Sequence, residues 1–162
     1  MKIIHNQMLP ILGESKRITF EQIKATKPIV FEESNSLKVF ISELHDHNHE
    51  STLEKWLRER FRKHAEERVN FFSDIYKFEF NRIAIKDTRS RWGSCSSKLN
   101  LNFSWRLIFT PLKSIDYVFV HELAHTKQMN HSKNFWAIVE EIMPDYKVHK
   151  KILHELEKEI FS

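Results

Sequence analysis

Short apolar runs separated by polar turns fill the first third of the chain, which is the pattern of β-strands. Runs rich in β-branched and aromatic residues predict strands at residues 3–4, 8–12, 17–20, 29–31 and 37–41. The polar stretches at residues 13–16 and 33–36 predict hairpin turns between some of these strands. We expect the strands to form an antiparallel meander.

A long amphipathic helix is predicted next. Ser51 and Glu54 have the spacing of a capping box, which marks a helix N-terminus. Charged residues occupy one face of the segment that follows, and apolar residues recur at helical intervals at Leu53, Trp56, Leu57, Phe61, Ala65, Val69 and Phe72. The apolar face is expected to pack against the core.

Strand character then returns, and it gives way to helices in the last third. Residues 78–80 and 83–85 predict strands, and the segments 89–97 and 99–103 predict a hairpin joined near residues 96–98. A short helix is expected at residues 105–109.

Three longer helices are predicted in the last third. Thr110 as N-cap and Pro111 at the first position begin a helix that runs to about Gln128. A second helix is capped by Ser132, and a third begins at residues 144–145. The elements predict an α+β fold in a single domain over residues 1–162. It would have a β-rich N-terminal part at about residues 1–45 and a catalytic part at about residues 78–162.

Composition narrows the classes of function. With only 2 glycines, a glycine-rich phosphate loop is excluded, and left-handed turns are expected at Asn, Asp or Lys. The single cysteine cannot form an internal disulfide, and no apolar run approaches the ~18 residues of a membrane span. Without a signal-peptide pattern, we expect a cytoplasmic protein that has no membrane partner. The net charge of +4 and the pI of about 9.1 permit a nucleic-acid partner without requiring one.

The segment from His121 to His125 reads H-E-x-x-H, a spacing that suits a zinc hydrolase. Residues four apart in a helix lie about 40° apart around its axis and ~6 Å apart along it, so both imidazoles can reach one zinc ion. Glu122 projects about 100° from His121 and can act as general base on a zinc-bound water without binding the metal.

The surroundings strengthen this interpretation, because chance alone would supply the motif in about one such chain in twenty. The apolar run at residues 117–120 predicts a buried helix, and two histidines and a glutamate inside it need a shared partner. The alternative is a pair of core histidines with separate hydrogen-bond partners.

His131 is the predicted third ligand, since it follows His125 at the interval seen in longer zinc motifs. We expect Asn130 to adopt a left-handed conformation that ends the helix and frees His131 to turn toward the metal. Three protein ligands leave a fourth position for water, as in catalytic zinc sites. A solvated loop histidine is the alternative.

Three other histidines alternate at His45, His47 and His49. In an extended segment they would share one face and could bind a metal weakly. We favour a polar loop before the long helix.

Longer stretches of the chain strongly resemble the YgjP-like metallopeptidase family. The similarity is carried by residues 91–97 and 101–108 of the hairpin region, by residues 116–125, and by residues 129–132, 135–136 and 143–146. These motifs are long and specific, they cover most of residues 89–146, and the family looks like the zincin-fold proteases of the WLM and SprT kinds. The resemblance implies a zincin-like fold and one zinc ion bound by His121, His125 and His131, with Glu122 as the catalytic base.

The resemblance also suggests a role for the hairpin. In zincins a strand lies above the metal-binding helix and can pair with an extended peptide, and residues 91–95 are the candidate for that strand. Arg91, Trp92 and Ser94 would then contact substrate. Core packing is the alternative for Trp92 and Cys95.

Other side chains are candidates for substrate contacts. Arg89, Arg91 and Arg106 could line the cleft and bind a phosphate or carboxylate group, or they could simply be surface arginines. Tyr146 and His149 are candidates for stabilising an oxyanion.

Three functions remain open at this stage. The leading one is a zinc metallopeptidase that acts on peptides or proteins. A metal-dependent nucleoside triphosphate pyrophosphatase would use the same metal with the arginines, and some relatives are described as nucleotide pyrophosphatases. A zinc-stabilised, DNA-associated binding module would need the three histidines but not Glu122. Neither the substrate nor the oligomeric state can be predicted from the sequence.

Overall fold

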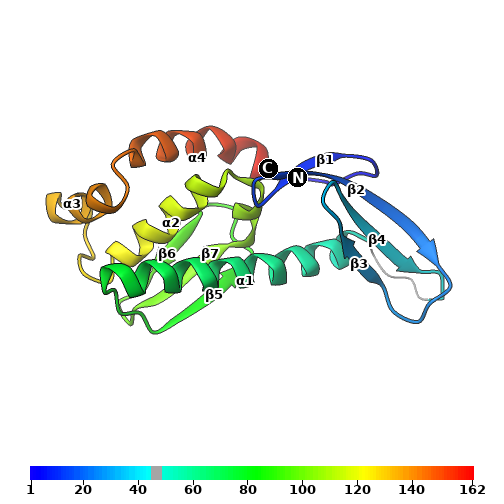
Figure 1. Cartoon of the computed structure of the whole chain (residues 1–162), viewed down its shortest axis with the longest axis horizontal. Helices are drawn as coiled ribbons and strands as arrows, with labels where there is room; N and C mark the ends of the chain where they lie inside the picture. The colour runs from blue at the N-terminus through cyan, green and yellow to red at the C-terminus, as the bar shows by residue number, and fades with distance from the viewer. Residues whose placement is uncertain (45–48) are drawn as a thin grey trace.

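Two small β-sheets and four α-helices form the α+β fold seen in the computed structural model (Figure 1), which describes residues 1–44 and 49–162. In chain order the elements are β1 (Met8–Ile11), β2 (Glu14–Ile23), β3 (Ile29–Glu32), β4 (Ser36–Ser42), α1 (His49–Tyr76), β5 (Arg82–Lys86), β6 (Gly93–Cys95), β7 (Asn100–Ser104), the 3₁₀ helix η1 (Trp105–Phe109), α2 (Leu112–Ala124), α3 (Lys133–Ile142) and α4 (Tyr146–Ile160). The α+β class predicted from the sequence is confirmed.

The N-terminal sheet differs from the predicted meander in one pairing. Its strand order is β1-β2-β4-β3, and β2 runs parallel to β4, with Ile18 opposite Leu37. Residues 24–28 carry the chain past the position of β4, so β3 becomes the edge strand and the tight turn that follows returns β4 to the middle. The antiparallel expectation is therefore wrong for β2 and β4. It is right for β1–β2 and β3–β4.

Helix α1 is the element that joins the two sheets (Figure 1). Its buried residues recur every four positions, as the periodicity predicted, and they include Leu53, Leu57, Phe61, Ala65 and Val69. Removing each large apolar side chain from water contributes about 1.5–3 kcal/mol to folding. The helix begins at His49, so the predicted capping box at Ser51 is not its start.

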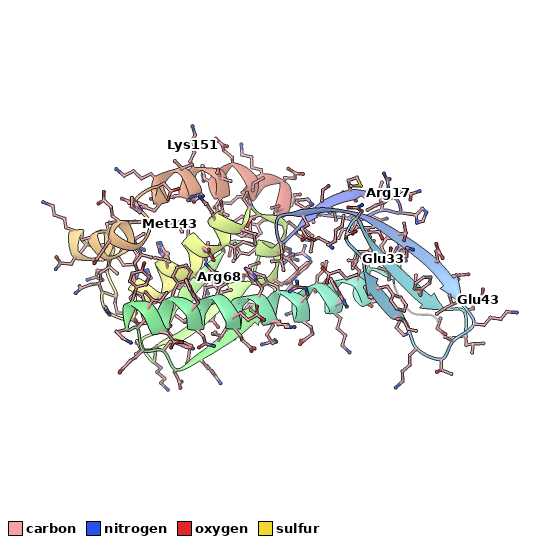
Figure 2. The ribbon with its side chains drawn as sticks, viewed as in Figure 1. Arg17, Glu33, Glu43, Arg68, Met143 and Lys151 are labelled. Carbon is pink, nitrogen blue, oxygen red and sulfur yellow. The ribbon has the colours of Figure 1, made fainter. Side chains whose placement is uncertain are left out.

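A two-pronged ion pair fixes α1 against α2. Arg68 Nε donates to Asp116 Oδ1 at 3.0 Å and Arg68 Nη2 donates to Asp116 Oδ2 at 2.9 Å, and Figure 2 shows Arg68 between the two helices. The rings of Phe119 on α2 and Phe61 on α1 also stack in the core, with their centroids 6.1 Å apart. These contacts fix the position of α2, which carries the candidate site, against α1.

The second sheet brings a short strand to the edge beside α2. Its order is β5-β7-β6, with β6 antiparallel to β7, so the predicted hairpin is confirmed. Leu101 and Phe103 point inward from β7, and the Phe103 ring contacts Phe119 of α2 at 4.9 Å. The predicted strands at residues 3–4 and 78–80 do not form, because neither segment has a neighbouring strand to pair with.

The ends of the helices follow the sequence only in part. Ser132 accepts a hydrogen bond from the Phe135 N–H and caps α3 as predicted. Thr110 instead donates its hydroxyl to Leu107 and closes η1, so α2 begins only after Pro111. No helix within residues 1–44 and 49–162 is long and apolar enough to cross a bilayer.

Candidate metal centre

Three histidine rings converge at the C-terminal end of α2. His121 lies in the last turn of the helix, and His125 is the residue that caps it, so the two rings project from one face as the four-residue spacing requires. His131 reaches the same point from the loop that leads into α3. Its Nε2 lies 3.1 Å from Nε2 of His125 and 3.2 Å from Nε2 of His121.

The chain returns to the site through tight turns rather than through a left-handed residue. The N–H groups of Thr126 and Lys127 donate to the carbonyls of Leu123 and Ala124, three residues earlier, and these tighter turns end α2. Asn130 is not among the described residues with positive φ, so its predicted left-handed conformation is wrong. The rings of Phe135 and Trp136 on α3 then stack on the histidines and hold His131 in place.

The ring nitrogens form a donor set that suits a divalent metal. His125 Nδ1 lies 3.1 Å from the Gln128 carbonyl, which can only accept, so Nδ1 carries the proton and Nε2 presents a lone pair. Because Nε2 of His125 carries no proton, the three Nε2 atoms cannot all donate hydrogen bonds to one another. Nitrogens that each bind zinc at about 2.0–2.1 Å in a tetrahedron are separated by roughly 3.4 Å, close to the spacing here. The residues present therefore fit a zinc ion.

An outer contact orients the ring of His121, as the Gln128 carbonyl does for His125. Tyr117 lies one turn before His121, and its hydroxyl is 3.2 Å from His121 Nδ1. Partners of this kind fix the tautomer and direction of a ligand histidine. Burial, and then the neighbouring His125 and His131 with Lys150 last, lowers the pKa of His121 to about 3, so its ring is neutral and available to a metal.

Glu122 lies between two cavities and is 6% exposed. In the metal-free protein burial raises the pKa of its carboxyl to about 8, and the positive charge of Arg91 partly opposes this shift. A Cβ on Gly93 would lie 3.1 Å from Glu122 Cγ and 3.2 Å from Glu122 Oε2. The glycine therefore lets β6 approach the carboxylate closely.

The first cavity, named the metal cleft, is about 280 Å³ and contains the three histidines. Its opposite wall is β6, and it is lined by Gly93, Ser94, Cys95, His121, Glu122, His125, Met129 and His131. At the two ends of the β6–β7 ladder, the Ser104 N–H donates to the Trp92 carbonyl and the Ser96 N–H donates to the Asn100 carbonyl. Hydrogen-bonded pairs alternate along an antiparallel ladder, so Ser94 and Asn102, midway between them, also form a hydrogen-bonded pair. The backbone groups of Gly93 and Cys95 therefore point away from β7, along the open edge of the sheet.

The second cavity, named the α4 pocket, is about 270 Å³ and lies between α2 and α4. It meets the metal cleft at Gly93, His121 and Glu122, and its other lining residues are Trp92, Tyr117, Val118, Lys150, Leu153, His154 and Glu157. The catalytic candidates thus have a hollow on each side.

The remaining predicted site residues divide into two groups. Trp92 lines the α4 pocket and Ser94 lines the metal cleft, whereas Arg91 lines a third cavity that also contains Gly93 and Ser94. Arg89 and Arg106 instead line a separate cavity against α1 and the N-terminal segment. Arg106 is 5% exposed and donates to Asp87 Oδ1 at 2.5 Å, so its charge already has a partner.

The candidates for oxyanion stabilisation lie outside the metal cleft. Tyr146 stacks on Trp136 with ring centroids 5.1 Å apart, and His149 is buried between Ser114 and Asp145. His49 packs on Phe20 in the N-terminal half, 4.6 Å between centroids, whereas His45 and His47 lie outside the described residues.

Sequence reasoning did not identify three residues that border Glu122 or the histidines, namely Gly93, Tyr117 and Lys150. Tyr117 could have been found, because it precedes His121 by four residues on the same helix. Lys150 could not, since it reaches the site only through the packing of α4 on α2.

Comparison with known proteins identifies a family and a similar fold. Residues 1–156 match the model of the YgjP-like family, described as a metallopeptidase domain. The crystal structure of the metallopeptidase zymogen of Pyrococcus abyssi abylysin is similar in fold, with a TM-score of 0.50 and 21% identity, over 59% of this chain and 93% of that one. No curated protein matches the chain.

Proposed function

Because the chain belongs to the YgjP-like family and is a hydrolase of the metallopeptidase kind, we propose that it cleaves peptide bonds with one zinc ion and Glu122. His121, His125 and His131 would hold the zinc, and Glu122 would be the general base. The observation that carries this proposal is the convergence of three Nε2 atoms beside a buried carboxylate and an open strand edge.

Strand β6 supports binding of an extended substrate. Its outward N–H and C=O groups, at Gly93 and Cys95, can pair with a peptide backbone laid along the edge. Such pairing would hold the peptide between β6 and α2, beside Glu122. The missing side chain at Gly93 leaves room for that approach.

Glu122 is suited to carry a proton between water and the leaving group. A zinc ion held by His121, His125 and His131 would supply a Lewis acid for the scissile carbonyl and for the attacking water. Glu122 takes a proton from the attacking water and later delivers it to the amide nitrogen of the leaving peptide. Burial of its carboxyl keeps bulk water from competing for that proton.

Arginine placement favours a peptide over a nucleotide. The pyrophosphatase hypothesis requires a cluster of cations at the metal, but Arg106 is committed to Asp87 and shares a different cavity with Arg89. Arg91 alone of these three arginines is close enough to act on Glu122 electrostatically. These three arginines therefore do not form the cation cluster that a triphosphate would need.

The test is side-by-side turnover of an unfolded-protein mixture and of nucleoside triphosphates by the zinc-loaded protein. Wild type should release peptides, and Glu122→Gln should lower the rate by about 10²–10⁴-fold while binding the same amount of zinc. Glu155→Gln, at an exposed position on α4, is the matched control and should keep full activity. Full activity in Glu122→Gln would exclude the general-base role, and faster turnover of triphosphates than of protein would favour the pyrophosphatase.

A further inference from the structure

Two side chains that line the α4 pocket have no hydrogen-bond or ion-pair partner in the part of the chain that is described. The ammonium of Lys150 forms no ion pair there, and its recorded neighbour is the Trp136 ring, 4.9 Å from Nζ. Trp92 is 8% exposed, and its indole Nε1 is buried without a hydrogen-bond partner. Because Nε1 is enclosed, the Trp92 ring serves as part of the pocket wall, whereas the ammonium of the exposed Lys150 is accessible to a ligand with a negative group.

The rest of the pocket fits a side chain that is apolar at its base and anionic at its tip. Val118 and Leu153 are apolar wall residues and are almost fully buried. Glu157 also borders the pocket, with its carboxylate 3.4 Å from His154 Nδ1, a contact that is an ion pair only when the imidazole is protonated. Lys150 is the lysine that lines the pocket beside Glu122, and it forms no ion pair among the described residues.

A buried contact holds Lys150 in position. His149, the preceding residue, is 6% exposed, with Nδ1 3.3 Å from the Ser114 hydroxyl on α2 and Nε2 3.0 Å from Asp145 Oδ2. These contacts fix the first turn of α4 against α2. Lys150 therefore stays at the pocket instead of moving with a loose helix end.

We propose that the α4 pocket binds a carboxylate of the substrate peptide, with Lys150 as the specificity-determining cation and the Trp92 ring as part of the wall that the bound group contacts. The inference rests on the proposed peptidase function. The carboxylate can belong to an Asp or Glu side chain or to the C-terminus of the peptide, since both present the same two oxygens.

The first test needs no turnover. The ¹⁵N-labelled, metal-free chain has 4 tryptophans, and Trp92→Phe identifies the indole resonance of Trp92. Short peptides that differ only as Glu or Gln, each with a free or an amidated C-terminus, are titrated into the protein. Peptides with a carboxylate should shift the Trp92 resonance, and Lys150→Met should weaken their binding about tenfold or more.

Lys151→Met is the matched control, because Lys151 projects from the outer surface of α4 (Figure 2) and does not border the pocket. It should leave the titration unchanged. The Glu/Gln and free/amidated arms separate the two sources of the carboxylate. Equal binding of the neutral, amidated peptide would overturn the proposal, and so would tighter binding of a nucleoside triphosphate than of any peptide.

The second test measures cleavage by the zinc-loaded enzyme. Lys150→Met should lower kcat/KM for carboxylate-bearing peptides by roughly 10–100-fold and change neutral peptides by less than about twofold. Lys150→Glu should shift the preference toward basic peptides. If peptides are cleaved but acidic and neutral ones slow equally in Lys150→Met, the pocket assignment is wrong. If wild type cleaves no peptide, the peptidase function fails, and the titration still decides the pocket.

Discussion

The histidine centre and the Arg106–Asp87 cluster both bury polar side chains, but only the second is complete without a ligand. Arg106 donates to Asp87 Oδ1 and to the Thr88 carbonyl, and the Trp105 indole donates to the same carboxylate. The Nη1 group of Arg106 and the Trp105 indole therefore each meet an acceptor. At the histidine centre three ring nitrogens face one another, and that of His125 presents a lone pair. A self-sufficient cluster stabilises a fold, whereas a cluster with converging lone pairs is arranged for an ion.

Among the substitutions that separate the two clusters, loss of one histidine should have the largest effect. His131→Ala removes one of three ligands and should weaken zinc affinity by more than about 100-fold, measured by competition with a chelating dye. Because His131 is exposed, stability of the metal-free protein should change by less than ~0.5 kcal/mol. His154→Ala, a histidine whose side chain is 83% exposed, is the control. Equal losses of affinity in the two variants would contradict the three-histidine site.

Substitutions at Gly93 and Gly13 should separate an effect on catalysis from an effect on stability. Gly93→Ala places a Cβ against Glu122 and should lower kcat/KM by about 100-fold, because small displacements of a reacting group are costly. Gly13 has φ of +81° in the turn between β1 and β2, so Gly13→Ala should cost ~1–2 kcal/mol of stability instead. Kinetics and denaturant unfolding of both variants would check this. A kinetic loss in Gly13→Ala without unfolding would break the distinction.

The Arg106–Asp87 cluster should show the opposite response to the histidine centre. Arg106→Leu should lower the free energy of unfolding by about 1–3 kcal/mol and leave zinc affinity unchanged, since lost hydrogen bonds to a charged group have this size. Denaturant titration and zinc competition measure the two quantities. A loss of zinc affinity with unchanged stability would instead bring Arg106 into the site.

The stability from this cluster should also depend on pH. Burial raises the pKa of Asp87, but hydrogen bonds from Arg106 and Trp105 together outweigh it and hold the pKa below its ordinary value. A carboxyl with a lowered folded pKa stabilises the fold above the unfolded pKa of about 3.9 and loses that contribution as pH falls through the folded value. The difference between wild type and Arg106→Leu should therefore shrink in acid.

Local spacing explains what could be predicted from the sequence. The apolar face of α1, the β6–β7 hairpin and the convergence of His121 with His125 each depend on residues close together in the chain. Helical and strand periodicity determines such contacts directly. His131 could be predicted as a ligand for the same reason, although the turn that brings it to the site differs from the predicted one.

Contacts between distant segments explain the rest. The parallel pairing of β2 with β4 depends on where the chain crosses the sheet, and apolar alternation is the same for either direction. Arg106 and Arg91 look alike in the sequence, yet η1 turns Arg106 toward Asp87 and α1. Lys150 reaches its pocket only because His149 bonds to Ser114, 35 residues away.

The smallest predicted effect concerns Tyr117, which borders the histidine centre without binding the metal. Burial, and then the charges of Glu122 and Tyr146, raises the pKa of its hydroxyl well above the ordinary value, so the group keeps its proton. If Nε2 of His121 binds zinc, Nδ1 carries the ring proton and donates it to the Tyr117 oxygen.

Tyr117→Phe removes that acceptor and should weaken zinc affinity about tenfold, the lower end of outer-contact effects. Tyr146→Phe is the matched control, because Tyr146 shares the aromatic stack but makes no hydrogen bond to a metal-ligand histidine among the described residues. Zinc competition at fixed pH measures both variants. If the two lose affinity equally, the stack rather than the hydroxyl orients His121, and the site depends on packing as the Arg106 cluster does.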